Sequence, residues 1–231
     1  MRFLRKLLST VGLCFIALSA SATPADPKNG VEYLTLESRQ NTESGKKIEV
    51  IEFFGYFCPH CNVFDPSLTE WVKKQGDNIV FKRIHIAFGE SMVPQQRLYF
   101  ALEAMGKTEE MHKKIFAAIH NERQSLNKEE AIIDFVVKQG IDKQKFVDTY
   151  NSFAVQTKAR RATQMQSTYK IDGVPTIVID GQYLTSPSIA GKGQPTEPAM
   201  QDAALKVMDV LVARARPAAA VADKSKKATK N

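Results

Sequence analysis

Two cysteines stand three residues apart in the sequence Cys58-Pro59-His60-Cys61. A thiolate is the nucleophile in thiol–disulfide exchange, and a second thiol one helical turn away can resolve the mixed disulfide that the first one forms. We therefore predict that Cys58 is the attacking thiolate and that Cys61 is the more buried, resolving thiol. A protonated His60 beside Cys58 would stabilise its thiolate, and Pro59 suits the first turn of a helix.

Other roles for the cysteine pair are less well supported by the sequence. A disulfide across so short a loop restricts the unfolded chain little, by roughly 2 kcal/mol at most. A zinc site needs four ligands, and the histidines follow no finger spacing: His60, His85, His112 and His120. Two reduced core cysteines would be unusual in an oxidising compartment. We expect no metal site, and no nucleotide or flavin motif indicates another cofactor.

The residues around the pair predict the elements that position it. A run of β-branched and aromatic residues over 48–54, bounded by glycines, predicts a buried strand. Apolar residues at helical spacing after Pro59 predict a helix that ends at Gly76, and 79–86 predicts a second strand. Together they form a βαβ unit with the cysteines at the start of its crossover helix, where unpaired N–H groups favour a thiolate.

The following stretch, 89–168, has a helical pattern throughout. Asn127, with Glu130 three residues later, predicts the start of one helix, and Asp142 is expected to cap the next. The second of these helices should carry three aromatic side chains on one face: Phe146, Tyr150 and Phe153. The stretch therefore predicts a subdomain of several helices.

Strand patterns return after this helical block. They cover 176–180 and 182–185, which are joined by the tight-turn pair Asp180-Gly181. A final helix is expected after Thr196, with Pro198 in its first turn. This order of elements predicts an α/β sheet interrupted by a helical insertion.

The N-terminal end has the pattern of a secretory signal peptide. A basic stretch over 1–6 precedes an apolar run over 11–18 and three small residues at 20–22. The apolar run is much shorter than the roughly 20 residues of a membrane-spanning helix. We assign residues 1–22 to a leader, expect an exported protein, and favour this interpretation over a lipid anchor at Cys14.

The C-terminal end is rich in lysine and alanine. Residues 216–231 contain no aromatic side chain, so we expect a disordered tail. The formal net charge of +7 is partly due to the lysines of this tail and to the leader. Because nucleic-acid binding conflicts with export, we expect no nucleic-acid partner.

Two motifs together resemble a known family. The first is Phe53-Phe54-Gly55-Tyr56-Phe57-Cys58-Pro59-His60-Cys61, and the second is Gly173-Val174-Pro175-Thr176. Both are similar to motifs of the DsbA family of periplasmic dithiol oxidases, and the order of elements is similar from about residue 30 to 213. The resemblance implies a thioredoxin-like fold, built from 23–88 and 169–215, with 89–168 as an inserted helical subdomain.

The resemblance also implies roles for single residues. In the family, the proline matching Pro175 is cis and lies against the cysteine pair, and the backbone of the residue matching Val174 hydrogen-bonds the bound substrate. Glu52 matches a buried acid beneath the cysteines. Asp65 and Arg83 match charged positions below the site, although both could equally be solvated surface charges.

The sequence favours one direction of electron flow. Whatever stabilises the Cys58 thiolate stabilises the reduced protein, so its disulfide becomes more oxidising. We therefore expect a periplasmic dithiol oxidase that acts on reduced, unfolded exported proteins and works as a monomer. The family implies reoxidation by a DsbB-type membrane protein coupled to quinone. The alternatives are a reductase or an isomerase of the same fold, or a chaperone that does not use its cysteines.

Overall fold

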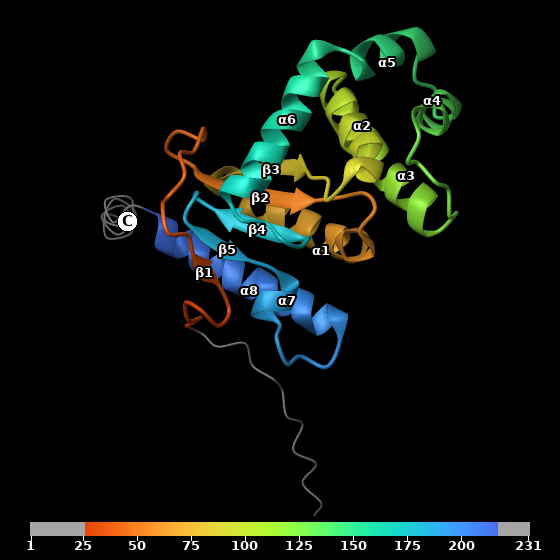
Figure 1. The fold of residues 1–231 in the computed structure, drawn as a ribbon. Helices are drawn as coiled ribbons and strands as arrows, with labels where there is room; N and C mark the ends of the chain where they lie inside the picture. The colour runs from red at the N-terminus through yellow and green to blue at the C-terminus, as the bar shows by residue number, and fades with distance from the viewer. Residues whose placement is uncertain (1–25, 217–231) are drawn as a thin grey trace, which may run out of the picture.

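A five-stranded mixed sheet forms the centre of the protein, for which a computed structural model describes residues 26–216. The strand order is β1-β5-β4-β2-β3 (Figure 1). The strands are β1 (Leu34–Thr35), β2 (Ile48–Phe54), β3 (Ile79–His85), β4 (Thr176–Ile179) and β5 (Tyr183–Thr185). β2 and β3 are parallel, and the other neighbouring pairs are antiparallel. The α/β class predicted from the sequence is therefore confirmed.

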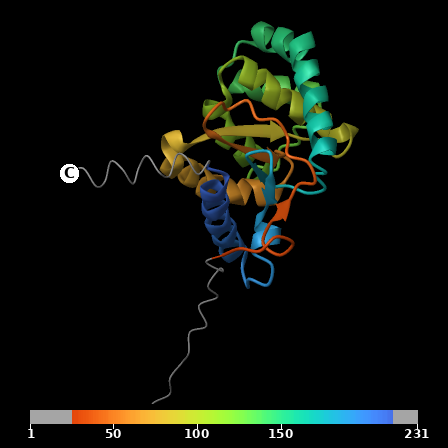
Figure 2. The ribbon, with the colours of Figure 1, turned by 90° about the vertical axis from the view of Figure 1, so that its left-hand side faces the viewer.

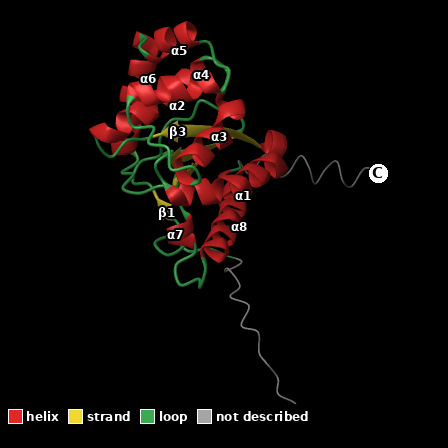
Figure 3. Cartoon of the chain, turned by 90° about the vertical axis from the view of Figure 1, so that its right-hand side faces the viewer, coloured by secondary structure: helices red, strands yellow, loops and turns green. Residues whose placement is uncertain are grey.

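Helices cover both faces of this sheet. The α-helices are α1 (Pro59–Gln75), α2 (Val93–Ala104), α3 (Thr108–His120), α4 (Glu129–Lys138), α5 (Lys143–Tyr150), α6 (Phe153–Thr168), α7 (Pro187–Ala190) and α8 (Glu197–Ala215). Two short 3-10 turns, η1 (Gly76–Asn78) and η2 (Glu90–Met92), precede β3 and α2. α1 and α8 lie side by side against one face (Figure 3), and the end of α6 packs on the other (Figure 2).

The strand predicted before the cysteines matches β2, whose seven residues are all buried. Both of its faces are covered, so its sequence is an almost continuous run of apolar residues. Val50 points toward α1 and α8, whereas Ile51 and Phe53 point toward the end of α6. Two carboxylates interrupt the run: Glu49 and Glu52 are only 3% and 2% exposed.

The helix predicted after Pro59 is also confirmed. α1 has Cys58 as its N-cap and Pro59 in its first turn, and it ends at Gly76. Gly76 has a φ of 52°, a left-handed conformation that glycine adopts without strain. The crossover from β2 through α1 to β3 therefore brings the cysteine pair to the carboxyl ends of the two parallel strands.

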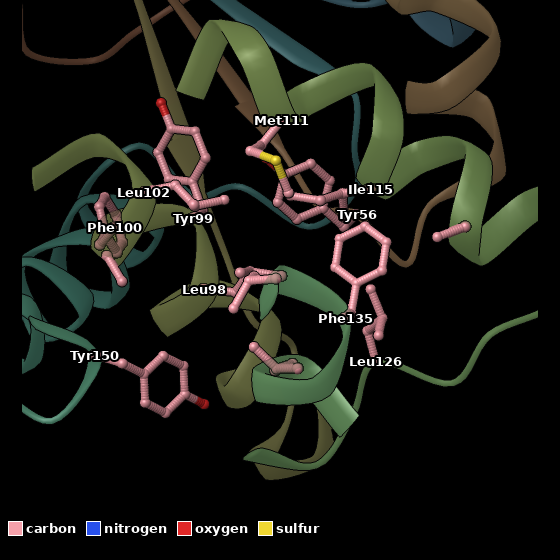
Figure 4. Close-up of a cluster of buried hydrophobic side chains, with 14 of the residues drawn as sticks. Tyr56, Leu98, Tyr99, Phe100, Leu102, Met111, Ile115, Leu126, Phe135 and Tyr150 are labelled. Carbon is pink, nitrogen blue, oxygen red and sulfur yellow. The ribbon is translucent and has the colours of Figure 1, made fainter. Parts of the chain in front are cut away.

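Five helices, α2 to α6, lie between β3 and β4 and gather at one end of the sheet (Figure 1). They enclose a core of their own, to which Tyr56 contributes from the loop before α1 (Figure 4). Members of this core that are completely or almost completely buried include Leu98, Leu102, Met111, Ile115, Phe146 and Tyr150. The domain boundaries at 88/89 and 168/169 stay a prediction.

Two details predicted for the helical block are wrong, and one is confirmed. Asp142 caps α5, accepting a hydrogen bond from the backbone N–H of Lys145 at 2.7 Å. Asn127 does not cap α4: the N-cap position falls on Lys128, without a side-chain hydrogen bond. Phe153 does not extend the aromatic face of α5, because Ser152 caps a new helix; Phe153 begins that helix and is 76% exposed.

The hairpin and final helix agree with the sequence. Asp180 and Gly181 have φ values of 53° and 62°, as the central residues of a tight turn between β4 and β5 require, and the backbone N–H of Gln182 closes this turn on the carbonyl oxygen of Ile179 at 3.0 Å. Thr196 caps α8, and Pro198 lies in its first turn. The predicted leader lies outside the described residues, as does the predicted tail beyond Arg216. Within residues 26–216, no helix combines the length and the apolar character that crossing a membrane requires.

The cysteine pair and its surroundings

The cysteines lie at the start of α1 in the arrangement that the sequence predicts. Both are free thiols in this structure. The Cys58 sulfur accepts a hydrogen bond from the backbone N–H of Cys61 at 3.3 Å. Cys58 keeps 5% of its surface exposed, whereas Cys61 is completely buried. An incoming sulfur therefore reaches Cys58 and not Cys61.

The two thiols have opposite proton affinities. The pKa of Cys58 is lowered from 9.0 to about 7, first by the hydrogen bond from the Cys61 thiol, and then by the backbone N–H groups of Cys61 and His60 and the charge of His60. These contributions outweigh burial, which acts in the opposite direction. The pKa of Cys61 is raised well above its usual value, mainly by burial and then by Cys58. Near neutral pH the thiolate therefore resides on the accessible cysteine.

His60 lies on the solvent side of the pair. Its side chain is 69% exposed, and its Nδ1 lies 2.7 Å from Oε1 of Glu197, in the first turn of α8. This contact is the main reason that the pKa of His60 is raised. Among the groups that lower the pKa of Cys58, the charge of His60 contributes least.

The loop before β4 faces Cys58. The Val174–Pro175 peptide bond is cis, which confirms the conformation that the resemblance implied. The Cys58 thiol donates a hydrogen bond to the carbonyl oxygen of Val174 at 3.3 Å. The side chain of Thr176 holds the loop by donating to the carbonyl oxygen of Gly173 at 2.7 Å. The backbone of Val174 is therefore already in hydrogen-bonding contact with the reactive sulfur.

Beneath the cysteines lies a buried group of charged side chains. Arg83 donates to Glu52 at 2.8 Å through Nε and to Asp65 at 2.7 Å through Nη2. Glu52 and Asp65 are 2% and 4% exposed, so neither carboxylate is a solvated surface charge. Burial raises the pKa of Glu52 despite its pairing with Arg83. The charge of Glu52 in turn contributes to the raised pKa of Cys61.

Three histidines extend this buried polar group around Tyr56. His112 contacts Asp65 at 3.2 Å through Nε2 and the Tyr56 hydroxyl at 3.1 Å through Nδ1. The Tyr56 backbone donates to Nε2 of His85 at 2.9 Å, and its carbonyl oxygen lies 2.8 Å from Nε2 of His120. Burial lowers the pKa of His85 to about 3, so this imidazole is neutral. Within residues 26–216, no three side chains of the kinds that ligate metals are gathered around a common point.

A groove of about 990 Å³ adjoins the cysteine pair. His60, Val174 and Pro175 line it at the active-site end, together with the first turn of α8. From there it continues along α7, the end of α6 and the segment that includes β1. A peptide segment bound here would contact His60 and the loop at Val174, whose carbonyl oxygen accepts the hydrogen bond from the Cys58 thiol.

Comparisons with known proteins agree with this geometry. Residues 49–203 match the family described as the DSBA-like thioredoxin domain. The chain is 43% identical over 198 residues to the thiol:disulfide interchange protein DsbA of Burkholderia cepacia, covering 83% of this chain and 93% of the relative. The corresponding protein of Pseudomonas aeruginosa PAO1 is 35% identical over 217 residues, covering 94% and 99%.

Solved structures give the same result. The crystal structure of Pseudomonas aeruginosa DsbA matches with a TM-score of 0.75 and 32% identity, covering 91% of this chain and 100% of that one. The oxidoreductase DsbA from Xylella fastidiosa matches with a TM-score of 0.73 and 28% identity, covering 82% and 98%. The chain therefore belongs to the DsbA family of thiol:disulfide oxidoreductases, which have the thioredoxin-like fold.

Proposed function

We propose that the protein is a periplasmic dithiol oxidase that passes the Cys58–Cys61 disulfide to reduced, exported proteins. The observation that carries this proposal is the difference between the two thiols. Cys58 is accessible and its pKa is lowered to about 7, whereas Cys61 is buried and its pKa is raised. A cysteine that is stabilised as a thiolate is a good leaving group, so the disulfide containing it is readily given away.

The reaction consists of two exchanges. A substrate thiolate attacks the Cys58 sulfur of the disulfide, a mixed disulfide forms, and Cys61 leaves and takes up a proton. A second substrate thiolate then attacks the substrate sulfur of the mixed disulfide and displaces Cys58 as a thiolate. The substrate loses two electrons and gains a disulfide, while the enzyme gains both electrons as a dithiol.

The surrounding residues support these steps in different ways. Pro59 begins the helix whose N-terminal N–H groups stabilise the departing Cys58, and His60 adds a positive charge nearby. The backbone of Val174, next to Pro175, binds an extended substrate segment once the Cys58 thiol no longer occupies its carbonyl oxygen. Glu52, when ionised, places negative charge beneath the pair, which favours the protonated form of Cys61 in the reduced enzyme.

Two partners follow from this function. Reduced, unfolded exported proteins supply the electrons, and their segments bind in the groove beside the cysteines. A DsbB-type membrane protein coupled to quinone restores the disulfide. We propose a periplasmic monomer in which both partners reach the same Cys58 sulfur in turn.

The proposal is tested by oxidative refolding of a reduced, unfolded ribonuclease with the oxidised protein as the only oxidant. We expect stoichiometric formation of substrate disulfides, loss of this activity in Cys58→Ser, and accumulation of a mixed disulfide when the substrate meets reduced Cys61→Ser in the presence of oxidised glutathione. A protein that only reduces or reshuffles substrate disulfides would instead be a reductase or an isomerase. Folding assistance that survives in Cys58→Ser would indicate the chaperone alternative.

A further inference from the structure

A carboxylate from the last helix contacts the histidine that lies between the two cysteines. Oε1 of Glu197 and Nδ1 of His60 are 2.7 Å apart, although the residues are 137 positions apart in the sequence. Glu197 lies in the first turn of α8 and His60 in the first turn of α1, and both line the groove. The contact therefore joins two helix N-termini at the place where substrate must approach Cys58.

We propose that Glu197 is a positioning residue for the redox reaction: it fixes the place and the charge of the His60 imidazole, so that His60 carries the same charge in the oxidised and reduced enzyme near neutral pH. The effect of Glu197 on the redox reaction rests on the proposed oxidase function. The pairing itself does not depend on the direction of catalysis, because it is present whether the enzyme oxidises or reduces its substrates.

The surroundings of His60 make Glu197 the dominant influence on its charge. The hydrogen bond and the charge of Glu197 both raise the pKa of His60, and the Cys58 thiolate adds to them. The loop that faces this region contributes uncharged residues: Gly173, Val174 and Pro175. Among the described residues, the other charged side chains that line the groove are Glu37, Lys170 and Asp172. Of these, Lys170 and Glu37 pair with each other at 3.0 Å.

Reduction of the disulfide creates a thiolate next to His60, and a thiolate makes a neighbouring imidazole bind its proton more tightly. An imidazole that titrates near its usual pKa of 6.5 would therefore take up part of a proton when Cys58 becomes a thiolate. The redox equilibrium would then vary more steeply with pH. On this proposal, Glu197 keeps His60 protonated in both states, so this additional proton uptake does not occur.

The test compares Glu197→Gln with the wild-type protein in two measurements. The first follows the His60 imidazole by NMR across pH in the oxidised protein, where Cys58 carries no charge. We expect His60 to titrate at lower pH in Glu197→Gln than in the wild type. This readout is independent of oxidase activity, so its failure is distinguishable from failure of the proposed function.

The second measurement is the equilibrium between the protein disulfide and glutathione from pH 6 to pH 8. Because exposed charge pairs contribute about 0.2–1 kcal/mol, the equilibrium constant of Glu197→Gln should change by an additional 1.5- to 5-fold over this range, relative to the wild type. The sign is fixed: raising the pH should disfavour the reduced form more strongly in the variant, because its reduced form binds the additional proton.

Asp202→Asn is the matched control, because it removes the same charge from an exposed position of α8. Asp202 pairs with no cation in the part of the chain that the structure describes, so both titrations should match the wild type. His60→Gln is a second variant that leaves Glu197 in place. Its redox equilibrium should follow the wild-type pH dependence, and Glu197→Gln added to it should have no further effect.

Three results would overturn the inference. One is a His60 titration that is unchanged in Glu197→Gln. Another is a wild-type redox equilibrium that depends more steeply on pH than that of His60→Gln, since His60 would then change its charge on reduction. The third is an undiminished effect of Glu197→Gln in the His60→Gln background, which would show that Glu197 acts on the cysteines directly.

Discussion

Replacing Cys58 by serine should remove a pH-dependent contribution to the stability of the reduced protein. Serine keeps the size of the side chain and can still cap α1, so the substitution removes little except the thiolate. In the folded protein the pKa of Cys58 is lowered. A lowered pKa stabilises the fold at pH values above the unfolded pKa, and this stabilisation is lost as the pH falls through the folded pKa. Stability should therefore rise with pH between the two values.

The magnitude follows from the two pKa values. A thiol that titrates at 9.0 when unfolded and at about 7 when folded adds about 1.3 kcal/mol to the free energy of unfolding between pH 6 and pH 8. Because Cys58 lies at the surface end of α1, solvent screens part of its interactions, and we expect about 0.5–1 kcal/mol. Cys61 contributes little in this range, since its raised pKa matters only as the pH approaches its unfolded value.

The assay is denaturant unfolding of the reduced wild-type protein and of Cys58→Ser under strictly reducing conditions, at several pH values from 6 to 8. Each transition is analysed as two-state, and the difference in the free energy of unfolding is plotted against pH. We expect this difference to shift in favour of the wild type as the pH rises. A difference that is constant, or that falls with pH, would refute the reasoning that Cys58 is a stabilised thiolate.

Three further outcomes follow from the geometry. At mildly acidic pH, iodoacetamide should modify Cys58 in the reduced protein and leave Cys61 unmodified, as peptide mass spectrometry would show; equal modification would contradict the assigned roles. Arg83→Met should lower the free energy of unfolding by about 3–5 kcal/mol, because it removes the guanidinium that pairs with two buried carboxylates. Phe54→Ala should cost about 3–5 kcal/mol because it empties a buried aromatic site, whereas Phe153→Ala on the surface should change stability by less than about 0.5 kcal/mol.

The elements closest to the cysteines could be predicted because local rules determine them. Pro59 sets the start of α1 and Gly76 its end, and both follow from the backbone preferences of single residues. β2 could be predicted because burial on both faces leaves an apolar run that only Glu49 and Glu52 interrupt. The relation between Cys58 and Cys61 is equally local, since one helical turn separates them. The cis conformation at Pro175 came from the resemblance, not from any rule for single residues.

Contacts between distant segments were not predictable in the same way. No spacing rule connects Glu197 with His60, and the only local signal was a carboxylate in the first turn of a capped helix. The role of His112 around Tyr56 was missed for the same reason, although both residues occupy apolar patterns that indicate burial. β1 has two residues and α7 has four, too few for a periodic pattern. Phe153 departs from the aromatic pattern of α5 because Ser152 caps a separate helix that begins there.

The central claim is that the protein disulfide is oxidising, and the reduction potential tests it most directly. The protein is equilibrated at pH 7 with buffers of defined thiol–disulfide potential, and the fraction of reduced protein is measured after acid quenching. Because the start of α1 stabilises the Cys58 thiolate only in the reduced state, we predict a potential more positive than about −180 mV, the value of a disulfide isomerase. A potential at or below that value would contradict the oxidase function and favour a reductase or an isomerase.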